Sequence, residues 1–389
     1  MANKLRVLVV GGGIAGMCFA TAARQREIEV DLVEISPTVL GFGIVLTGST
    51  LLALEHLGLA HACARLGWPI PLVRLFDSDG CFVADSLMPR IAAADLPVCC
   101  AISRPVLAAI LAESASRLGT QIRIGITIDE IEHVERKIRV CFSNKTRSEY
   151  DVVVGADGSY SRVRQLTFSK AVQPKLAGQG AWRFLTERHN EVSQFLLFSS
   201  GPLKTGFVPL NEQSMYVWST VRDASRVRVE PQLAPQLYSE VLREFGAPLV
   251  REMCARLETA DAATVLWRPF ETLLMERWSE GNVVLIGDAA HAVSPHISSG
   301  GGMAIEDAVV LASHLTEAAP IEILLKRFNA QRIERVRRVY DVSLAICREE
   351  CSENPSTDKI YKLTMQGYNE LAQPFMEAPG LRTALEVHC

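Results

Sequence analysis

Three absences in the sequence narrow the class of protein before any pattern is considered. None of the ten cysteines stands in a Cys-x-x-Cys pair, so we expect buried free thiols and no metal site. Basic residues are not in excess, and a net charge of −4 gives no electrostatic reason to expect nucleic acid or an anionic membrane as a partner. No apolar run is long enough to cross a bilayer, so we expect no membrane span.

Length and composition indicate a soluble globular protein. The chain has 389 residues, of which 48% are hydrophobic and 22% are charged, which allows two domains and a substantial core. A strand-like segment begins already at Lys4, so we expect no signal peptide and a cytoplasmic location. We expect a monomer or a homodimer, and the sequence shows no internal repeat.

The first 34 residues carry the pattern around which the rest of the chain is organised. An apolar strand at 4–10 is followed by a glycine turn, a helix at 17–24 and a second strand at 29–33, which ends on Glu34. The turn has the spacing Gly-x-Gly-x-x-Gly, formed by Gly11, Gly13 and Gly16. In such a βαβ unit the glycines let a pyrophosphate approach the helix N-terminus, and the acid binds ribose hydroxyls. The pattern predicts a dinucleotide site.

Two more apolar strands run into a glycine and an aspartate. Residues 150–154 lead into Gly155-Ala156-Asp157, and residues 282–286 lead into Gly287-Asp288. Ligands of open α/β sheets bind outside the carboxyl ends of the strands, so Asp157 and Asp288 can reach one extended ligand. Either aspartate alone is better explained as a helix cap or turn residue, but the three junctions together favour the ligand.

The middle and the end of the chain have different predicted secondary structure. Between about 178 and 229, short strands alternate with polar turns, which predicts a mostly antiparallel sheet in a second lobe. Residues 321–346 have the pattern of a long basic helix, which we expect to be solvated and to lie between the domains. Its basic residues include Arg332, Arg335, Arg337 and Arg338.

These segments resemble the single-component aromatic hydroxylases that use FAD, the group of para-hydroxybenzoate and salicylate hydroxylase. The resemblance extends over residues 4–345 and is carried by motifs in the same order. The matching segments are Gly11-x-Gly13-x-x-Gly16 with Glu34, Ile102-Ser103-Arg104-Pro105, Gly155-Ala156-Asp157-Gly158-Ser159, Gly287-Asp288-Ala289-Ala290-His291, Pro295-His296 and Gly300-x-x-x-Ala304-Ile305-Glu306-Asp307-Ala308.

The resemblance implies an α/β fold: a Rossmann-like FAD-binding domain, an inserted, mostly antiparallel substrate-binding sheet domain, and a long C-terminal helix. We expect the FAD-binding domain to be discontinuous. The expected limits are 1–72, 98–177 and 268–320 for the FAD-binding domain, 73–97 and 178–267 for the substrate-binding domain, and 321–389 for the C-terminal helical region.

The resemblance also implies contacts with FAD. The residues implied at the pyrophosphate are Gly11, Gly13, Ile14, Ala15 and Gly16. The further contacts are Glu34 at the adenosine ribose, Gly43 beside the cofactor, Arg104 at the ribityl–phosphate region, Asp288 at a ribityl hydroxyl, and Asp157, which supports FAD and the docking of the reduced nicotinamide. The amides of Gly301 and Gly302 would face the N1–O2 edge of the reduced flavin, and Gly300 is a further implied contact with the cofactor.

Two positions depart from the family pattern. Ser298 stands where the family usually has glycine, and Met303 stands near where it often has Asn or Gln. The glycines of this loop are shifted into the run 300–302, so the sequence leaves open which amides face the flavin.

In this family NADH or NADPH reduces FAD, and O2 then gives a C4a-hydroperoxyflavin that transfers one oxygen to an electron-rich ring. The implied substrate is a small aromatic or N-heteroaromatic compound of the phenol, hydroxybenzoate or hydroxypyridine type. Pro295 would lie by the isoalloxazine, and His296 is the first candidate for the base, with a packing role as an equal alternative. His291 is expected to be structural. Candidates for substrate contact on the sheet, with core packing as the alternative, are Trp182, Arg183, Phe207, Tyr216 and Trp218.

Other functions on the same scaffold stay open. A reductase or dehydrogenase that never transfers oxygen is the nearest alternative, and a non-catalytic carrier is a second one. A halogenase is disfavoured because the sequence has no Trp-x-Trp-x-Ile-Pro segment. A second Gly-x-Gly-x-x-Gly unit is also lacking, so we expect NAD(P)H to dock transiently at the flavin rather than in a domain of its own.

Overall fold

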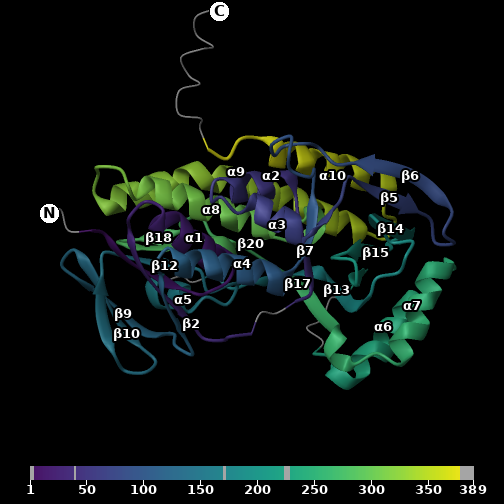
Figure 1. The fold of residues 1–389 in the computed structure, drawn as a ribbon, viewed down its shortest axis with the longest axis horizontal. Coiled ribbons are helices and arrows are strands. Elements are labelled where there is room, and N and C mark those ends of the chain that lie inside the picture. The colour runs from purple at the N-terminus through teal and green to yellow at the C-terminus, as the bar shows by residue number, and fades with distance from the viewer. Residues whose placement is uncertain (1–3, 39–40, 170–171, 223–227, 377–389) are drawn as a thin grey trace, which may run out of the picture.

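The computed structural model describes residues 4–38, 41–169, 172–222 and 228–376 (Figure 1). Two large sheets dominate the molecule, one mostly parallel and one mostly antiparallel, and two small antiparallel sheets accompany them. This arrangement confirms the predicted α/β fold with an inserted antiparallel sheet.

Six strands form the sheet that carries the first motif. The order is β18-β19-β12-β1-β2-β8, and all neighbours run parallel except β18 and β19. Its central strands are apolar throughout because both of their faces are covered, so that Val7, Leu8 and Val9 have no exposed surface. The strands are β18 (Ser279–Glu280), β19 (Val283–Leu285), β12 (Val152–Gly155), β1 (Arg6–Val10), β2 (Glu29–Glu34) and β8 (Gln121–Ile124).

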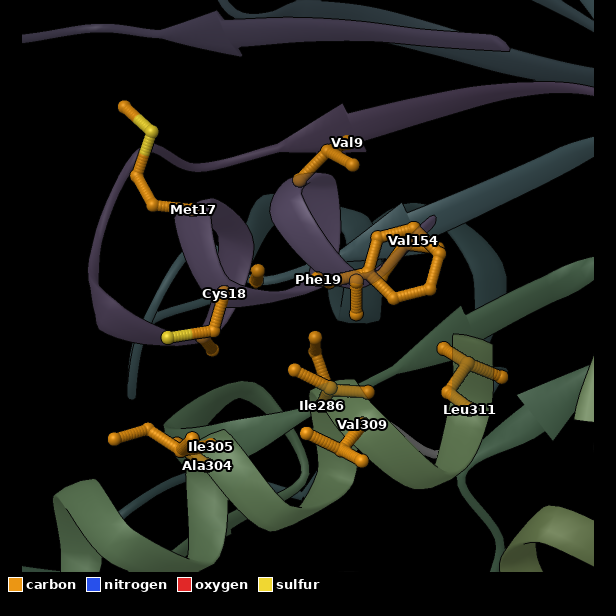
Figure 2. Packing of buried hydrophobic residues seen from close by; sticks show 14 of the residues in the cluster. Val9, Met17, Cys18, Phe19, Val154, Ile286, Ala304, Ile305, Val309 and Leu311 are labelled. Atoms are coloured by element: carbon orange, nitrogen blue, oxygen red, sulfur yellow. The ribbon is translucent and has the colours of Figure 1, made fainter. Parts of the chain in front are cut away.

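Helices α1 (Ile14–Arg24) and α8 (Gly300–His314) pack closely together against this sheet. Figure 2 shows Phe19 of α1 and Val309 of α8 on either side of Ile286, which follows β19. Both helices are rich in alanine and glycine, and these small side chains allow the close approach. Their N-termini therefore meet at the edge where the parallel strands end. The other helices packed on this core are α2 (Gly48–Glu55), α3 (Ala60–Leu66), α4 (Arg104–Arg117) and α5 (Arg162–Thr167).

The second large sheet has eight strands in the order β20-β17-β13-β16-β15-β14-β5-β6. Its neighbours are antiparallel except for β14 and β5. Helices α6 (Ala234–Leu242) and α7 (Pro248–Glu258) cover one face and enclose a second core, at one end of the molecule (Figure 1). The strands are β20 (His291–Ala292), β17 (Val265–Leu274), β13 (Lys175–Glu187), β16 (Ser214–Arg222), β15 (Leu203–Pro209), β14 (Phe195–Ser200), β5 (Leu72–Phe76) and β6 (Phe82–Leu87).

The smaller elements connect these layers. The small sheets consist of β3 (Gly43–Leu46), β7 (Cys100–Ser103) and β4 (Trp68–Pro69), and of β11 (Arg147–Tyr150), β10 (Lys137–Phe142) and β9 (Ile128–Val134). The short 3-10 segments are η1 (Pro231–Leu233), η2 (Ala262–Thr264), η3 (Gly287–Ala289) and η4 (Pro295–Ile297).

The C-terminal region consists of α9 (Ile321–Glu350) and α10 (Thr357–Ala372), which lie along each other (Figure 1). The prediction of a solvated basic helix holds for Arg337 and Arg338, but it is wrong for Arg332 and Arg335, which are 0% and 5% exposed. Positions three and four apart share a helix face, so these two arginines lie on the face that packs on α8, where they pair with buried carboxylates.

The predicted domain limits stay a prediction, and residues 377–389 of the expected C-terminal region lie outside the described residues. β17 crosses the predicted limit at 267/268, since it pairs along its length with the large sheet. In the described parts of the chain, no helix combines the length and the apolar character needed to cross a membrane.

Candidate active site

The three strand-to-loop junctions meet, because β1, β12 and β19 are neighbouring parallel strands. Gly11 follows β1 with a positive φ of 107°, and a β-carbon there would lie 2.3 Å from the carbonyl oxygen of Ala156. Only glycine fits this approach. A β-carbon on Gly287 would lie 3.0 Å from that of Ala15 and 3.1 Å from that of Ala304. The residues of the first and third motifs are therefore in direct contact.

The first turn has the features of a pyrophosphate site. Gly13 is exposed, and a β-carbon on it would meet no atom within 4 Å, so the approach to the N-terminus of α1 is open. Glu34 at the end of β2 accepts a hydrogen bond from the amide of Gly12 at 2.6 Å and one from the amide of Ser36 at 2.8 Å. The carboxylate thus stands beside the glycine turn, where the βαβ pattern places it.

Asp157 forms hydrogen bonds within its own turn, and its predicted support of FAD and of nicotinamide docking stays a prediction. Its carboxylate accepts hydrogen bonds from the hydroxyl of Ser161 at 2.5 Å and from the amides of Arg162 and Val163 at 2.7 and 3.0 Å. Burial raises the pKa of Asp157, against the opposing effect of the Ser161 hydrogen bond. The carboxylate is therefore used at the start of α5, as in the capping alternative.

A cavity of about 370 Å³ extends from these junctions to the large sheet. Its lining contains most of the residues that the sequence placed around the flavin. These are Gly43, Arg104, Asp288, Pro295, His296, Gly300 and Gly301. Gly43 approaches the ring of Tyr216 so closely that a β-carbon would lie 2.5 Å from it. Pro295 follows β20 in the turn η4, directly before the loop to α8.

Arg104 and Asp288 are charged groups on this lining that form no ion pair within the described residues. The carboxylate of Asp288 belongs to a residue that lines the open cavity. The surrounding protein partly desolvates this carboxylate, and this raises the pKa of Asp288 although the charges of His291 and Arg104 act in the opposite direction. Arg104 is exposed at the start of α4, and its guanidinium has no hydrogen-bond partner in the described part of the chain. Both groups are available to a ligand.

The three glycines at the start of α8 differ in what they contact. Gly300 and Gly301 line it, whereas a β-carbon on Gly302 would lie 2.4 Å from Oγ1 of Thr50, so Gly302 serves packing against α2. Ser298 adopts the left-handed conformation with φ 51°. The position therefore favours glycine, the residue usual in the family, and the serine is tolerated there at a conformational cost.

Strand alternation decides which sheet residues reach the cavity. Tyr216, Trp218 and Arg183 line it, because they lie on the face of the large sheet opposite α6 and α7. The prediction of substrate contact is wrong for Trp182 and Phe207, which belong to the core between the sheet and these helices. Trp182 stacks on Tyr238 there, with ring centroids 5.7 Å apart. Neighbouring residues of a strand point to opposite faces, so Arg183 faces the cavity where Trp182 does not.

His296 lies in the cavity wall with both ring nitrogens engaged by the protein. Nδ1 lies 3.0 Å from Oγ of Ser294, and Nε2 lies 2.7 Å from Oε1 of Gln179 and 3.4 Å from a carboxylate oxygen of Glu350. The His296 side chain is only 4% exposed. This geometry favours the packing alternative over direct proton transfer from a substrate.

His291, expected to be structural, is buried 2.5 Å from a carboxylate oxygen of Asp307.

The cavity residues that were not predicted include Lys204, Glu350, Thr364 and Tyr368. Burial opposes ionisation of Glu350, but the hydrogen bond and charge of His296 and the charge of Lys204 outweigh it and lower its pKa to about 2. Alternation along β15 places Lys204 on the face opposite Phe207, so the incorrect prediction for Phe207 pointed Lys204 away from the cavity. The sequence has no signal for Thr364 and Tyr368, because their helix reaches the cavity only through the tertiary fold.

The donors and acceptors of this site fit a flavin dinucleotide. An open glycine turn, a helix N-terminus, and an arginine and an aspartate that have no partner among the described residues lie along one edge of the parallel sheet. Among the described residues, no group of three or more His, Cys, Asp or Glu side chains is placed to hold a metal ion. Fold and site together define a flavoprotein of the dinucleotide-binding α/β class.

Comparison with known proteins agrees with this class. The model of the family described as FAD binding domain matches residues 4–343, so the chain belongs to that family. It is 28% identical to the putative FAD-dependent monooxygenase YetM of Bacillus subtilis over 93% of this chain and 99% of that protein. It is 30% identical to 2-heptyl-3-hydroxy-4(1H)-quinolone synthase of Pseudomonas aeruginosa over 86% of this chain and 87% of the relative.

A similar solved structure is that of Klebsiella pneumoniae HpxO complexed with FAD and uric acid, with a TM-score of 0.80 and 23% identity. The match covers 97% of this chain and 94% of the HpxO chain, and it supports the fold. The family and the relatives show that this protein is an FAD-dependent monooxygenase, an oxidoreductase of a family in which NADH or NADPH is the typical co-substrate.

Proposed function

We propose that the protein hydroxylates an electron-rich N-heteroaromatic or aromatic ring that carries an acidic oxygen, and that Arg183 holds this oxygen. The proposal depends on the position and surroundings of the Arg183 side chain. This side chain lines the cavity and has no hydrogen-bond or ion-pair partner among the described residues. Burial lowers the pKa of the Arg183 guanidinium, more than the neighbouring Tyr216 offsets. A desolvated cation of this kind is stabilised by an anionic ligand.

The walls beside Arg183 suit a flat ring. Tyr216, Trp218, Phe195 and Phe270 line the same cavity and offer aromatic surfaces for stacking or edge contacts. Gly206 leaves room for the indole of Trp218, since a β-carbon there would lie 2.4 Å from the indole. The cavity thus combines apolar faces with the cation of Arg183, which is the arrangement expected for orienting a small aromatic anion.

The names of two relatives refer to N-heteroaromatic compounds. These relatives are the quinolone synthase and FAD-dependent urate hydroxylase of Klebsiella pneumoniae, the latter 26% identical over 95% of each chain. These names support an N-heteroaromatic ring for this chain as well. A neighbouring cation stabilises the deprotonated form of the ring oxygen. Deprotonation raises the electron density of the ring, and this favours attack of the ring on an electrophilic oxygen.

For FAD we propose the residues that fit it in this structure. Bound FAD supplies the redox and oxygen-transfer chemistry, while the protein binds the ring, orients it and excludes water. The proposed contacts are Gly11, Gly13, Ile14, Ala15 and Gly16 at the pyrophosphate, Glu34 at the ribose, Arg104 and Asp288 along the ribityl chain, and Gly43, Pro295, Gly300 and Gly301 around the flavin ring.

We also propose a cytoplasmic monomer or homodimer. Nine cysteines in the described ranges are free thiols, which fits a reducing compartment.

A paired panel of probes tests the substrate class. Hydroxybenzoates, hydroxypyridines and 4(1H)-quinolones are each compared with their O-methyl ethers, with NAD(P)H oxidation, O2 consumption and product measured together. We expect oxygenated product only from the members with the free oxygen. Equal turnover of the ethers would overturn the role of an acidic oxygen, and NAD(P)H oxidation without oxygenated product would favour a reductase.

Arg183→Gln tests the proposed contact directly. Loss of a charge-assisted hydrogen bond worth about 1.5–3 kcal/mol should weaken binding of the acidic probe by about 10- to 150-fold. The matched control is Arg268→Gln, since Arg268 is exposed on neighbouring β17 and does not line the cavity. Equal affinities of both variants and wild type would contradict the assignment.

A further inference from the structure

Helix α10 contributes to the cavity although it lies outside the part of the chain that the family model matches. The match ends at residue 343, whereas α10 spans Thr357–Ala372. Two of its residues, Thr364 and Tyr368, nevertheless line the cavity that also contains Arg183 and Pro295. One wall of the site is therefore built from a segment beyond the family's matched region, where differences between relatives in substrate choice can arise.

The position of α10 is fixed by two independent contacts. At Gly367 it lies on the turn η4, where a β-carbon would stand 2.9 Å from Cγ2 of Ile297, so only glycine allows this approach. At its C-terminal end, the guanidinium of Arg335 donates hydrogen bonds to the carbonyls of Glu370, Leu371 and Gln373 at 2.8 to 3.1 Å. The neighbouring Tyr368 is thus held in a defined place.

Two α10 residues with hydroxyl groups line the cavity, and of these only Tyr368 has no hydrogen-bond partner for its hydroxyl among the described residues. Thr364 donates its hydroxyl hydrogen to the carbonyl of Ile360 at 2.8 Å, within its own helix. The Tyr368 hydroxyl has no hydrogen-bond partner in the described part of the chain. Burial raises the pKa of Tyr368 to about 12, so the phenol stays protonated and can donate a hydrogen bond at neutral pH.

We propose that Tyr368 is a specificity-determining residue that donates a hydrogen bond to an acceptor on a ring substituent of the substrate. This inference rests on the proposed function, because Arg183 is assigned to the acidic oxygen and Tyr368 is left for a second acceptor. A donor on the cavity wall that has no partner among the described residues disfavours a substituent that is purely apolar at this point. The substrate class then narrows to rings that carry an acidic oxygen and a further oxygen or nitrogen acceptor on a side group.

Two quinolone probes of equal length test this. 2-Propyl-4(1H)-quinolone and 2-(methoxymethyl)-4(1H)-quinolone differ in one ether oxygen, and their dissociation constants are measured through the absorbance change of oxidised FAD in the enzyme. In Tyr368→Phe we expect the ratio of the methoxymethyl to the propyl constant to rise about 3- to 10-fold. The propyl constant should stay unchanged. Tyr361→Phe is the matched control, since Tyr361 lies on the same helix and is 53% exposed.

Each outcome bears on a different claim. An unchanged ratio in Tyr368→Phe, with both probes bound, overturns the role of Tyr368 and leaves the proposed function standing. The same rise in Tyr361→Phe overturns it too, because the effect would then not come from the cavity. If neither probe binds the FAD-loaded wild type, the proposed substrate class fails, and the assignment of Tyr368 fails with it.

Discussion

Arg332 of α9 donates a hydrogen bond from Nε to Oδ1 of Asp307 at 2.8 Å, and neither side chain has any exposed surface. The second oxygen of Asp307 accepts the amide of Gly287 at 3.0 Å, in the third motif. Burial opposes ionisation of Asp307, but the charges of His291 and Arg332 outweigh it and lower its pKa. A buried ion pair therefore ties the cofactor loop to the C-terminal helix.

Replacing Arg332 should be strongly destabilising. Arg332→Met leaves the carboxylates of Asp307 and Glu306 buried with fewer partners, which typically costs about 3–5 kcal/mol. Denaturant unfolding of the FAD-free protein measures this loss. Arg337→Met is the control, since its ion pair with Glu276 lies at the surface and should contribute less than about 1 kcal/mol. Similar losses in both variants would contradict the buried role of Arg332.

The carboxylate of Glu350 should make stability depend on pH in the acidic range. Its pKa falls from 4.5 to about 2 on folding, so its contribution is complete above pH 4.5 and is lost as the pH falls through 2. A shift of this size corresponds to roughly 3 kcal/mol. We expect unfolding free energies measured from pH 6 to pH 2 to fall less steeply in Glu350→Gln than in wild type. The exposed Glu334→Gln serves as the control, and parallel curves for wild type and Glu350→Gln would contradict the prediction.

Removal of the Asp288 carboxylate should affect FAD binding, whereas removal of the Asp157 carboxylate should affect the stability of the fold. Asp288 has no hydrogen-bond partner in the described protein, so Asp288→Ala should leave the FAD-free fold intact. It should weaken FAD binding by about 10- to 150-fold, the equivalent of one charge-assisted hydrogen bond. Asp157→Ala removes the partner of two amides at α5 and should lower the free energy of unfolding by about 0.5–2 kcal/mol even without FAD. FAD titration and thermal unfolding of both variants check this, and a reversed pattern would exchange the two roles.

The parts of the site that follow from local sequence could be predicted. The parts that depend on how distant elements pack together could not. Gly11 and Glu34 stand where the βαβ pattern puts them, because strand, turn and helix fix each other over a few residues. Trp182 and Arg183 show the limit: the strand was predicted, but its composition does not tell which face meets the cavity and which meets α6 and α7. Tyr368 was missed because its place depends on a contact between Gly367 and Ile297, 70 residues apart in sequence.

His296 follows Pro295 on the turn between the third motif and α8, so its loss should disturb the cavity wall more than the binding of FAD. His296→Ala removes one of the two hydrogen-bond partners of the Gln179 side chain and leaves Glu350 with Lys204 and Gln179. We expect the variant to retain FAD and to oxidise NAD(P)H with substrate present, but to yield less hydroxylated product and more hydrogen peroxide. The loosened wall no longer holds the ring in place or excludes water.

The pH dependence of this loss separates the two roles that the sequence left open for His296. Both imidazole nitrogens are engaged inside the protein, by Ser294 and Gln179, and the side chain is 4% exposed. A positioning role therefore predicts the same fractional loss of product per NAD(P)H at pH 6 and at pH 9. General-base catalysis predicts a loss that grows where the substrate is not already ionised, by about 100-fold or more in the assisted step. Product yields measured across pH 6 to 9 decide between the positioning role and general-base catalysis. Ser294→Ala, which frees Nδ1 of His296, is the control. We expect a loss of product that does not depend on pH.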